Sequence, residues 1–259
     1  MKLSCVDVAK TFRGGQSDVV ALDGVDLQVE ESEFVSIVGP SGCGKSTLFN
    51  ILAGLLTATR GQIRLDGRET EELLGRVGYM PQKDLLMPWR SVLDNVTLGL
   101  EIAGVTRREA RGLAVAQLDR FGLAGFERRW PESLSGGMRQ RAALLRTFLA
   151  GRELMLLDEP FGPLDALTRQ TMQGWLLEIW EGDRKTILLV THDVDEAIYL
   201  SNRVYVMSPR PGRMQMGIEI DLPRPRPIEV RTTPEFVALK RQLLEPLLAA
   251  SRKRFEDAA

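Results

Sequence analysis

Gly39-Pro40-Ser41-Gly42-Cys43-Gly44-Lys45-Ser46-Thr47 is the stretch that decides the fold of this chain of 259 residues. It fits the pattern G-x-x-x-x-G-K-[ST] and follows the apolar run Phe34-Val35-Ser36-Ile37-Val38, which predicts a strand, a loop and a helix in that order. Glycines let successive backbone N–H groups point at phosphate oxygens, Lys45 adds a positive charge, and the Ser46 hydroxyl can bind Mg²⁺. The alternative, a glycine-rich turn that only joins strand to helix, is disfavoured by these flanks. The stretch therefore predicts a phosphate-binding loop in an α/β fold.

Two carboxylates follow a second apolar run, Leu154-Met155-Leu156-Leu157. Asp158 and Glu159 are expected at the carboxyl end of a buried strand, which is the edge where α/β sheets bind ligands. Asp158 can hold the Mg²⁺ that Ser46 contacts, and Glu159 can polarise a water molecule beyond the terminal phosphate. Taken alone, an acidic strand end would be a solvated turn. The phosphate loop upstream makes the pair a candidate metal ligand and general base.

A second anion site is predicted at Leu134-Ser135-Gly136-Gly137-Met138-Arg139-Gln140-Arg141. A serine and two glycines here precede a run with helical periodicity, which describes a helix N-terminus with free amides. Those amides and the helix dipole favour an anionic group. One chain would thus carry two phosphate sites that lie far apart in sequence.

These motifs resemble the ATP-binding cassette (ABC) family. The resemblance implies a P-loop NTPase (RecA-like) core of α/β class, with an N-terminal antiparallel β-subdomain and an inserted α-helical lobe. It also implies ATP and Mg²⁺ as cofactors and a head-to-tail homodimer. In such a dimer, Ser135, Gly136 and Gly137 of one subunit serve the ATP that the other subunit holds.

The resemblance assigns two further polar residues to the catalytic site, beside Lys45 and Glu159. His192 is the only histidine of the chain and follows a buried apolar run; the matching histidine of the family contacts the terminal phosphate and helps to orient the attacking water. Gln82 matches the family's glutamine loop, where its amide could reach Mg²⁺ or the water. Taken alone, Gln82 would be a turn residue.

Two more residues are assigned to nucleotide binding. Phe12 lies where the family stacks an aromatic ring on adenine, although a core aromatic on the first strand is nearly as good an interpretation. Asp165, in the segment 161–165, resembles the aspartate of the family's inter-subunit loop, and this segment is called the aspartate loop below. Pro163 departs from the small alanine expected there, which leaves the path of that loop open.

The order of the motifs predicts a nucleotide-binding core interrupted by a helical lobe. A helix is expected from Ser91 through Leu100, with Ser91 as its N-cap and Asp94 three residues on, and a second one over 107–121. A C-terminal helix is expected from Pro234, with Pro246 kinking or ending it. The expected divisions are 1–82 (first part of the core), 83–150 (helical lobe with the signature), 151–222 (second part of the core) and 223–259 (C-terminal linker and helix).

The apolar loop Lys83-Asp84-Leu85-Leu86-Met87-Pro88-Trp89-Arg90 has two interpretations. Its apolar side chains either pack inside the lobe, as residues before an N-cap often do, or line a groove. In the family this segment receives a short helix of a membrane subunit, and Met87 and Trp89 would then be the anchors.

Composition excludes several other classes of protein. The balance of 34 Lys+Arg against 35 Asp+Glu gives a net charge of -1, so no basic field argues for nucleic acid. The two cysteines, one of them in the phosphate loop, make a disulfide framework improbable. Charge enters the first ten residues too early for a signal peptide, and no apolar run reaches the ~20 residues that span a bilayer. Any role at a membrane is therefore expected through a partner.

Several stretches resemble the nitrate, sulfonate and taurine importer subgroup of the family. They are residues 85–96, 134–141, 158–169 and 208–213. The resemblance implies an importer ATPase bound to two transmembrane permease subunits at the cytoplasmic face of the cell membrane, served indirectly by a solute-binding protein. Related importers of aromatic or thiamine-precursor compounds stay open as alternatives. So does a non-transport cassette acting on DNA or ribosomes, although such proteins generally carry paired cassettes or long insertions. A nucleotide kinase or GTPase is disfavoured because the chain has the signature segment and lacks an Asn-Lys-x-Asp guanine reader.

Overall fold

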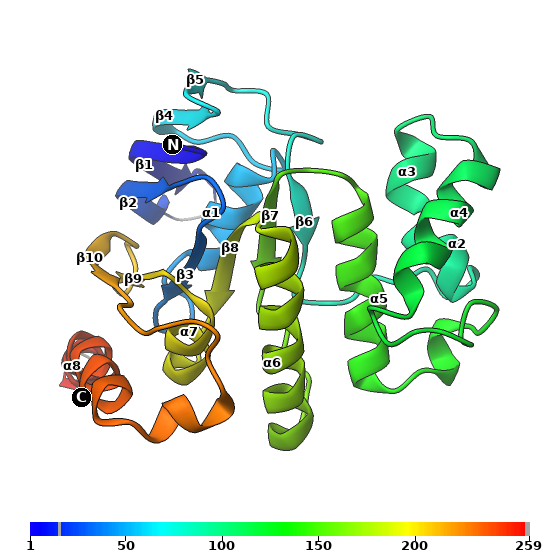
Figure 1. The fold of residues 1–259 in the computed structure, drawn as a ribbon. Coiled ribbons are helices and arrows are strands. Elements are labelled where there is room, and N and C mark those ends of the chain that lie inside the picture. The colour runs from blue at the N-terminus through cyan, green and yellow to red at the C-terminus, as the bar shows by residue number, and fades with distance from the viewer. Residues whose placement is uncertain (15–16, 257–259) are drawn as a thin grey trace.

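The computed structural model describes residues 1–14 and 17–256, so residues 257–259 of the expected C-terminal segment lie outside the described residues. Within those ranges the chain forms two β-sheets, a set of helices inserted between two strands of the larger sheet, and a C-terminal helix (Figure 1). This architecture confirms the predicted α/β class, with its antiparallel subdomain and helical insertion.

The larger sheet has six strands in the order β10-β9-β3-β8-β7-β6. Their bounds are β3 (Phe34–Val38), β6 (Gly78–Met80), β7 (Leu154–Asp158), β8 (Thr186–Thr191), β9 (Arg203–Met207) and β10 (Met214–Glu219). All neighbours pair in parallel except β10 and β9. The predicted apolar runs are thus parallel strands, whose two faces are both covered.

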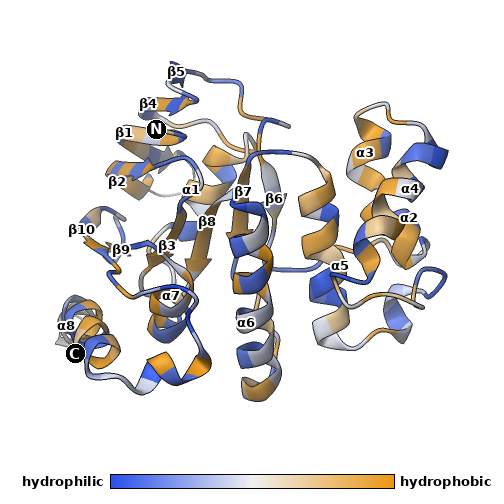
Figure 2. Cartoon of the chain, in the orientation of Figure 1, coloured by the Kyte–Doolittle hydropathy of each residue, from blue (hydrophilic) through white to orange (hydrophobic). Residues whose placement is uncertain are grey.

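Alternate residues of the central strands face two different cores. Phe34 and Leu157 belong to the core shared with helices α6 (Ala166–Asp183) and α7 (Val194–Leu200). Val35, which follows Phe34, belongs to the second core, and so does Leu156, which precedes Leu157. This core is shared with α1 (Lys45–Leu52) and the smaller sheet. All residues of β3, β7 and β8 are therefore buried, and Figure 2 shows β7 and β8 as largely apolar.

The smaller sheet is antiparallel, with the order β2-β1-β4-β5. Its strands are β1 (Leu3–Phe12), β2 (Val19–Val29), β4 (Arg60–Leu65) and β5 (Arg68–Glu69). Leu22, Val25, Leu27 and Val29 of β2 are all buried. They share one hydrophobic core with Cys43 of the phosphate loop and with the apolar residues of α1.

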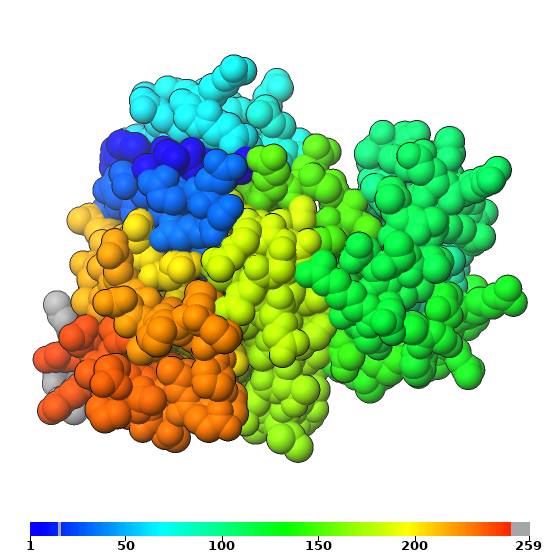
Figure 3. Space-filling view, in the orientation of Figure 1, coloured from blue at the N-terminus to red at the C-terminus, as the bar shows by residue number. Residues whose placement is uncertain are grey.

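The inserted lobe is helical and forms a projection at one side of the molecule (Figure 3). Its elements are α2 (Val92–Val96), α3 (Leu98–Ile102), α4 (Arg107–Leu118), η1 (Pro131–Ser133) and α5 (Gly136–Leu149). Ser91 caps α2 by accepting a hydrogen bond from the amide of Asp94, as predicted.

The single helix expected from Ser91 through Leu100 divides at Thr97, and that expectation is wrong. The single hydroxyl proton of Thr97 has three acceptors in reach: Glu101 Oε1 at 2.8 Å and the carbonyl oxygens of Leu93 and Asp94 at 3.1 and 3.3 Å. A threonine that bonds back to the preceding turn destabilises a helix slightly. Here α2 ends and α3 begins on either side of Thr97.

The C-terminal segment wraps over α7 and ends in η2 (Ile228–Thr232) and α8 (Pro234–Glu256). The buried Arg226 fixes this segment, because its guanidinium donates to the carbonyls of Ile198, Tyr199 and Ser201 at the end of α7. Pro234 begins α8 as predicted, but the helix continues past Pro246 instead of ending there. No helix within the described ranges is both long and apolar enough to cross a membrane.

Candidate active site

The phosphate loop joins β3 to α1, and its glycines are required by their conformation. Gly44 has a φ of 110° at the start of α1, and a Cβ atom there would lie 2.7 Å from Leu22 Cδ2. Gly42 also has a positive φ, of 77°. A side chain at Gly44 would therefore clash, and no side chain caps this helix start, so its amides can serve an anion.

Lys45, the first residue of α1, is buried and folded back over the loop. Its Nζ donates to the carbonyl oxygens of Gly39 and Pro40, at 2.7 and 3.1 Å. Cys43 is buried beside it, with Sγ 3.7 Å from Lys45 Nζ, and both cysteines of the chain are free thiols. The lysine charge is thus held at the mouth of the loop, where a phosphate would lie.

Asp158 ends β7 next to α1 and is only 4% exposed. Burial raises the pKa of its carboxyl, as does the charge of Glu159, while a hydrogen bond from Ser46 and the charge of Lys45 oppose this. A divalent cation would favour the charged form, and hydroxyl and carboxylate oxygens are ligands that Mg²⁺ prefers. The described residues contain no group of three or more His, Cys, Asp or Glu placed to hold a metal. Ser46 and Asp158 are the two oxygen donors of this site that could hold such a cation.

Glu159 follows β7 and contacts residues that follow the two other strands β6 and β8. Its amide donates to the carbonyl of Val190 in β8 at 2.9 Å, and its φ of 47° turns the chain sharply after β7. Its Oε2 accepts a hydrogen bond from Gln82 Nε2 at 2.9 Å and lies 3.5 Å from His192 Nδ1. The structure thus places Gln82, Glu159 and His192 together, after β6, β7 and β8.

Residues 22–162 match the family model described as ABC transporter. The chain belongs to the ABC transporter family. It is an ATPase of that family, and the subgroup resemblance read from the sequence agrees with the relatives below.

Curated ABC relatives match nearly the whole chain. An uncharacterized ABC transporter ATP-binding protein of Methanocaldococcus jannaschii is 46% identical over 95% of this chain and 91% of its own length. The taurine import ATP-binding protein of Rhizobium johnstonii is 44% identical over 92% of this chain and 94% of its own length. Relatives named for import of aliphatic sulfonates (Bacillus cereus), nitrate (Synechocystis sp.) and formylaminopyrimidine (Halalkalibacterium halodurans) are 40%, 40% and 41% identical, over at least 89% of this chain and at least 91% of each relative.

Solved ABC cassettes have the same fold. A bacterial ABC transporter cassette solved as a dimer has a TM-score of 0.75 and 32% identity, covering 85% of this chain and 99% of the cassette. A second structure of that cassette, in a post-hydrolysis state with ADP and phosphate, also has a TM-score of 0.75. ATP is accordingly the nucleotide of this chain.

The signature segment begins α5 as the sequence predicts. Ser135 is the N-cap, and its Oγ accepts a hydrogen bond from the Met138 amide at 3.3 Å. No acidic residue lies in the first turn of α5. The start of the helix lies against the aspartate loop and the start of α6: a Cβ at Gly136 would lie 3.5 Å from Leu164 Cδ2, and one at Gly137 would lie 3.2 Å from Thr168 Cγ2. The signature and the aspartate loop thus share one surface of the subunit.

Asp165 and Phe12 both lie at the surface. Asp165 caps α6, with Oδ1 accepting from the Thr168 amide at 3.0 Å. Hydrogen bonds from the Thr168 side chain and from this amide lower the pKa of its carboxyl. Phe12 ends β1 with 41% of its surface exposed and Lys10 Nζ 5.3 Å from the ring centre. The alternative that Phe12 is a core aromatic is therefore wrong.

The loop 83–90 has a fixed backbone and exposed apolar side chains. Leu85 and Trp89 are 59% and 71% exposed, whereas Leu86 is buried in the core. Arg146 of α5 donates to the carbonyls of Asp84 and Leu85, at 2.6 and 2.7 Å. The interpretation that the loop packs inside the lobe is therefore right for Leu86 and wrong for Leu85 and Trp89.

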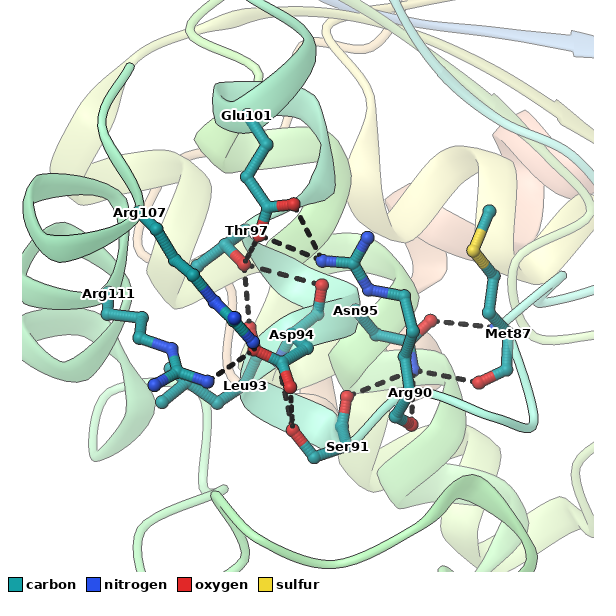
Figure 4. Close-up of polar contacts among 10 residues, drawn as sticks. All are labelled: Met87, Arg90, Ser91, Leu93, Asp94, Asn95, Thr97, Glu101, Arg107 and Arg111. Carbon is teal, nitrogen blue, oxygen red and sulfur yellow. Dashed lines mark hydrogen bonds and ion pairs between the residues drawn. The ribbon is translucent and has the colours of Figure 1, made fainter. Parts of the chain in front are cut away.

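The buried Asn95 of α2 holds the other half of this loop (Figure 4). Its Oδ1 accepts from the Met87 amide at 2.7 Å, and its Nδ2 donates to the carbonyls of Met87, Arg90 and Ser91. Sequence reasoning missed this residue. The signal was an asparagine among Val92 and Val96 on the apolar face of a predicted helix, where an unpaired amide would be costly.

Beside Trp89 lies an open hollow with a charged lining. Trp89, Arg90, Asp94, Glu101 and Arg107 line it. Arg90 pairs with Glu101 at 2.8 Å, and Arg107 and Arg111 both pair with Asp94, at 3.2 and 2.7 Å. Burial of Asp94 acts to raise the pKa of its carboxyl, but hydrogen bonds from Arg111, Arg107 and Ser91 outweigh it and lower the pKa to about 2. The Asp94 carboxyl is therefore charged at physiological pH and available to both arginines.

Proposed function

We propose that this chain is the ATP-hydrolysing subunit of an ABC importer and acts as a head-to-tail homodimer bound to two membrane permease subunits. The proposal of ATP hydrolysis is supported above all by one observation: Gln82 and His192 both lie next to Glu159 Oε2. A carboxylate that a neutral amide orients is suited to accept a proton from an attacking water.

The remaining roles follow from chemistry and position. The loop amides of residues 39–47 and Lys45 bind the phosphates, and Phe12 stacks on the adenine. Ser46 and Asp158 would hold Mg²⁺ through their oxygen atoms, and the amide oxygen of Gln82 would be a further oxygen ligand. When bound, Mg²⁺ neutralises charge on the terminal phosphates. His192 contacts the terminal phosphate and orients the water beside Glu159.

The dimer would complete each site. Ser135, Gly136 and Gly137 offer a helix N-terminus to the ATP held by the partner, and Asp165 lies on the same surface. A dimer is supported by the related cassette that was solved as one.

The loop 83–90 is our candidate for the contact with a permease subunit. Exposed apolar side chains on a fixed backbone bind with little loss of conformational entropy, and an exposed tryptophan is a common anchor. The adjoining charged hollow would set the orientation of the bound segment. The chain would then lie at the cytoplasmic face of the membrane, with a solute-binding protein delivering solute to the permease.

We infer a small polar solute of the taurine, sulfonate or nitrate type, on the strength of the relatives named for those solutes. A thiamine precursor is the second candidate, because one relative is named for formylaminopyrimidine. The test is ATP-driven uptake into vesicles that hold the chain with its cognate permease, supplied with the cognate solute-binding protein and each labelled solute. Uptake of one solute that stops with Glu159→Gln is the expected result. ATP hydrolysis with no uptake of any of these solutes would contradict the solute class.

A further inference from the structure

Arg169, one turn into α6, bridges the aspartate loop and the residue that follows His192. One terminal nitrogen of its guanidinium donates to the Leu164 carbonyl at 3.0 Å. The other lies 3.8 Å from Asp193 Oδ2, close enough for an ion pair. A single side chain therefore touches the loop that carries Asp165 and the loop that carries His192.

Asp193 fixes the backbone on both sides of itself. Its Oδ1 accepts from the amides of Asp195 and Glu196, at 2.9 and 3.1 Å, and so caps α7. Its own amide donates to Thr191 Oγ1 at 3.0 Å. His192 lies between these two anchor points. Any movement of the Asp193 carboxylate is thus passed to the backbone of His192.

The guanidinium of Arg169 is confined. Its side chain is 28% exposed, and its Nε is buried without a hydrogen-bond partner in the part of the chain that the structure describes. Arginine presents its donors in a rigid planar fork, whereas lysine is a point charge on a flexible stem. Only arginine can hold the Leu164 carbonyl and the Asp193 carboxylate together in this arrangement.

We propose that Arg169 is a positioning residue for hydrolysis, which couples the conformation of the aspartate loop to the position of His192 beside Glu159. This inference rests on the roles proposed above for Asp165 and His192. A partner subunit that seats on the aspartate loop moves the Leu164 carbonyl. Through Arg169 and Asp193 that movement reaches the imidazole.

The test uses the fact that His192 is the only histidine of the chain, so an untagged, ¹⁵N-labelled full-length protein gives one set of imidazole NMR signals. Arg169→Gln removes both contacts. Asp193→Asn removes the charge and keeps a good N-cap. Arg169→Lys keeps the positive charge but removes the planar guanidinium with its two terminal donors. The matched control is Lys240→Gln, which removes a different ion pair to α7, with Asp195 at 2.8 Å.

We expect Arg169→Gln and Asp193→Asn to shift the His192 signals, the double variant to match the single ones, and Lys240→Gln to leave the signals in place. Arg169→Lys should give an intermediate shift. In the transporter complex, Arg169→Gln should lower kcat by about 10- to 100-fold with KM for ATP nearly unchanged, because misplaced catalytic groups affect turnover more than binding. The inference would be overturned if Arg169→Gln left the His192 signals unmoved. It would also be overturned if Arg169→Lys shifted them no more than the control Lys240→Gln does.

Failure of the proposed function gives a different result. Full turnover of His192→Ala in the complex overturns the role of His192, and the present inference with it. Loss of turnover in His192→Ala with unmoved signals in Arg169→Gln overturns the inference alone.

Discussion

Gln82 Nε2 donates a hydrogen bond to Glu159 Oε2 over 2.9 Å, across 77 positions of sequence. The same oxygen lies 3.5 Å from His192 Nδ1. The carboxylate is therefore oriented by the protein itself. Because the donor is a neutral amide, it fixes the direction of Glu159 without adding charge to the site.

Gln82→Glu tests this relationship. The substitution replaces the amide donor with a second carboxylate, so the hydrogen bond to Glu159 is lost and the two like charges repel each other. Turnover in the complex should therefore fall by about 10- to 100-fold, because Glu159 is no longer held in place. The measurement is turnover in the complex, with Gln82→Asn as a neutral control. Wild-type turnover by Gln82→Glu would contradict the role of this contact.

Lys45→Ala should lower ATP turnover by at least about 100-fold, because the loop loses the charge nearest the phosphates. Lys45 lies over the loop through bonds to Gly39 and Pro40, so the melting temperature should also be recorded. Turnover at the wild-type rate in a folded variant would contradict the assignment of the phosphate loop.

Trp89→Asp should weaken assembly with the permease and leave the free subunit stable, because the side chain is 71% exposed. The measurements are the melting temperature of the free subunit and co-purification with the permease. Leu86→Ala is the matched control: it removes a buried side chain of the same loop and should destabilise the subunit by about 2–4 kcal/mol. Intact assembly of Trp89→Asp would refute the proposed permease contact.

Glu196→Gln should change how stability depends on pH. Burial, helped by the charge of Asp193, raises the pKa of the Glu196 carboxyl from 4.5 to about 7. The folded state therefore binds a proton more tightly than the unfolded state, and this group lowers stability as pH rises from about 4.5 to about 7. Glutamine has no proton to lose.

The free energy of unfolding of the variant, relative to the wild type, should therefore rise across that window by up to roughly 3 kcal/mol and then stay level. Urea unfolding at pH 5, 6, 7 and 8 measures it. The exposed Glu245→Gln serves as control. Parallel curves for Glu196→Gln and wild type would show that the group does not titrate as described.

The sequence sufficed for features that depend on neighbours in the chain. A strand, a loop and a helix around Lys45, and carboxylates at the end of β7, follow from local pattern and the geometry of parallel sheets. The same holds for the Ser135 cap and for the start of α8 at Pro234.

Features that depend on contacts between distant segments could not be predicted. The bonds from Arg146 to the loop 83–90 span about 60 positions, and no local pattern marks them. The exposure of Phe12 and Trp89 also depends on what packs beside them. The break at Thr97 depends on which of three acceptors its hydroxyl bonds, because threonine in a helix has two good rotamers.

The most direct test of the central claim compares untagged Glu159→Gln with and without MgATP. Light scattering measures the mass of the free subunit, and the nucleotide retained is measured in the permease complex. Glutamine keeps the shape of the side chain but is a poor base, so ATP should bind and remain unhydrolysed, with turnover lowered by about 10²- to 10⁴-fold. We predict that MgATP doubles the mass of the free Glu159→Gln subunit. Adding Lys45→Ala to the same chain should abolish this doubling. Wild-type turnover by Glu159→Gln, or neither a dimer of the free subunit nor trapped ATP in the complex, would contradict the account.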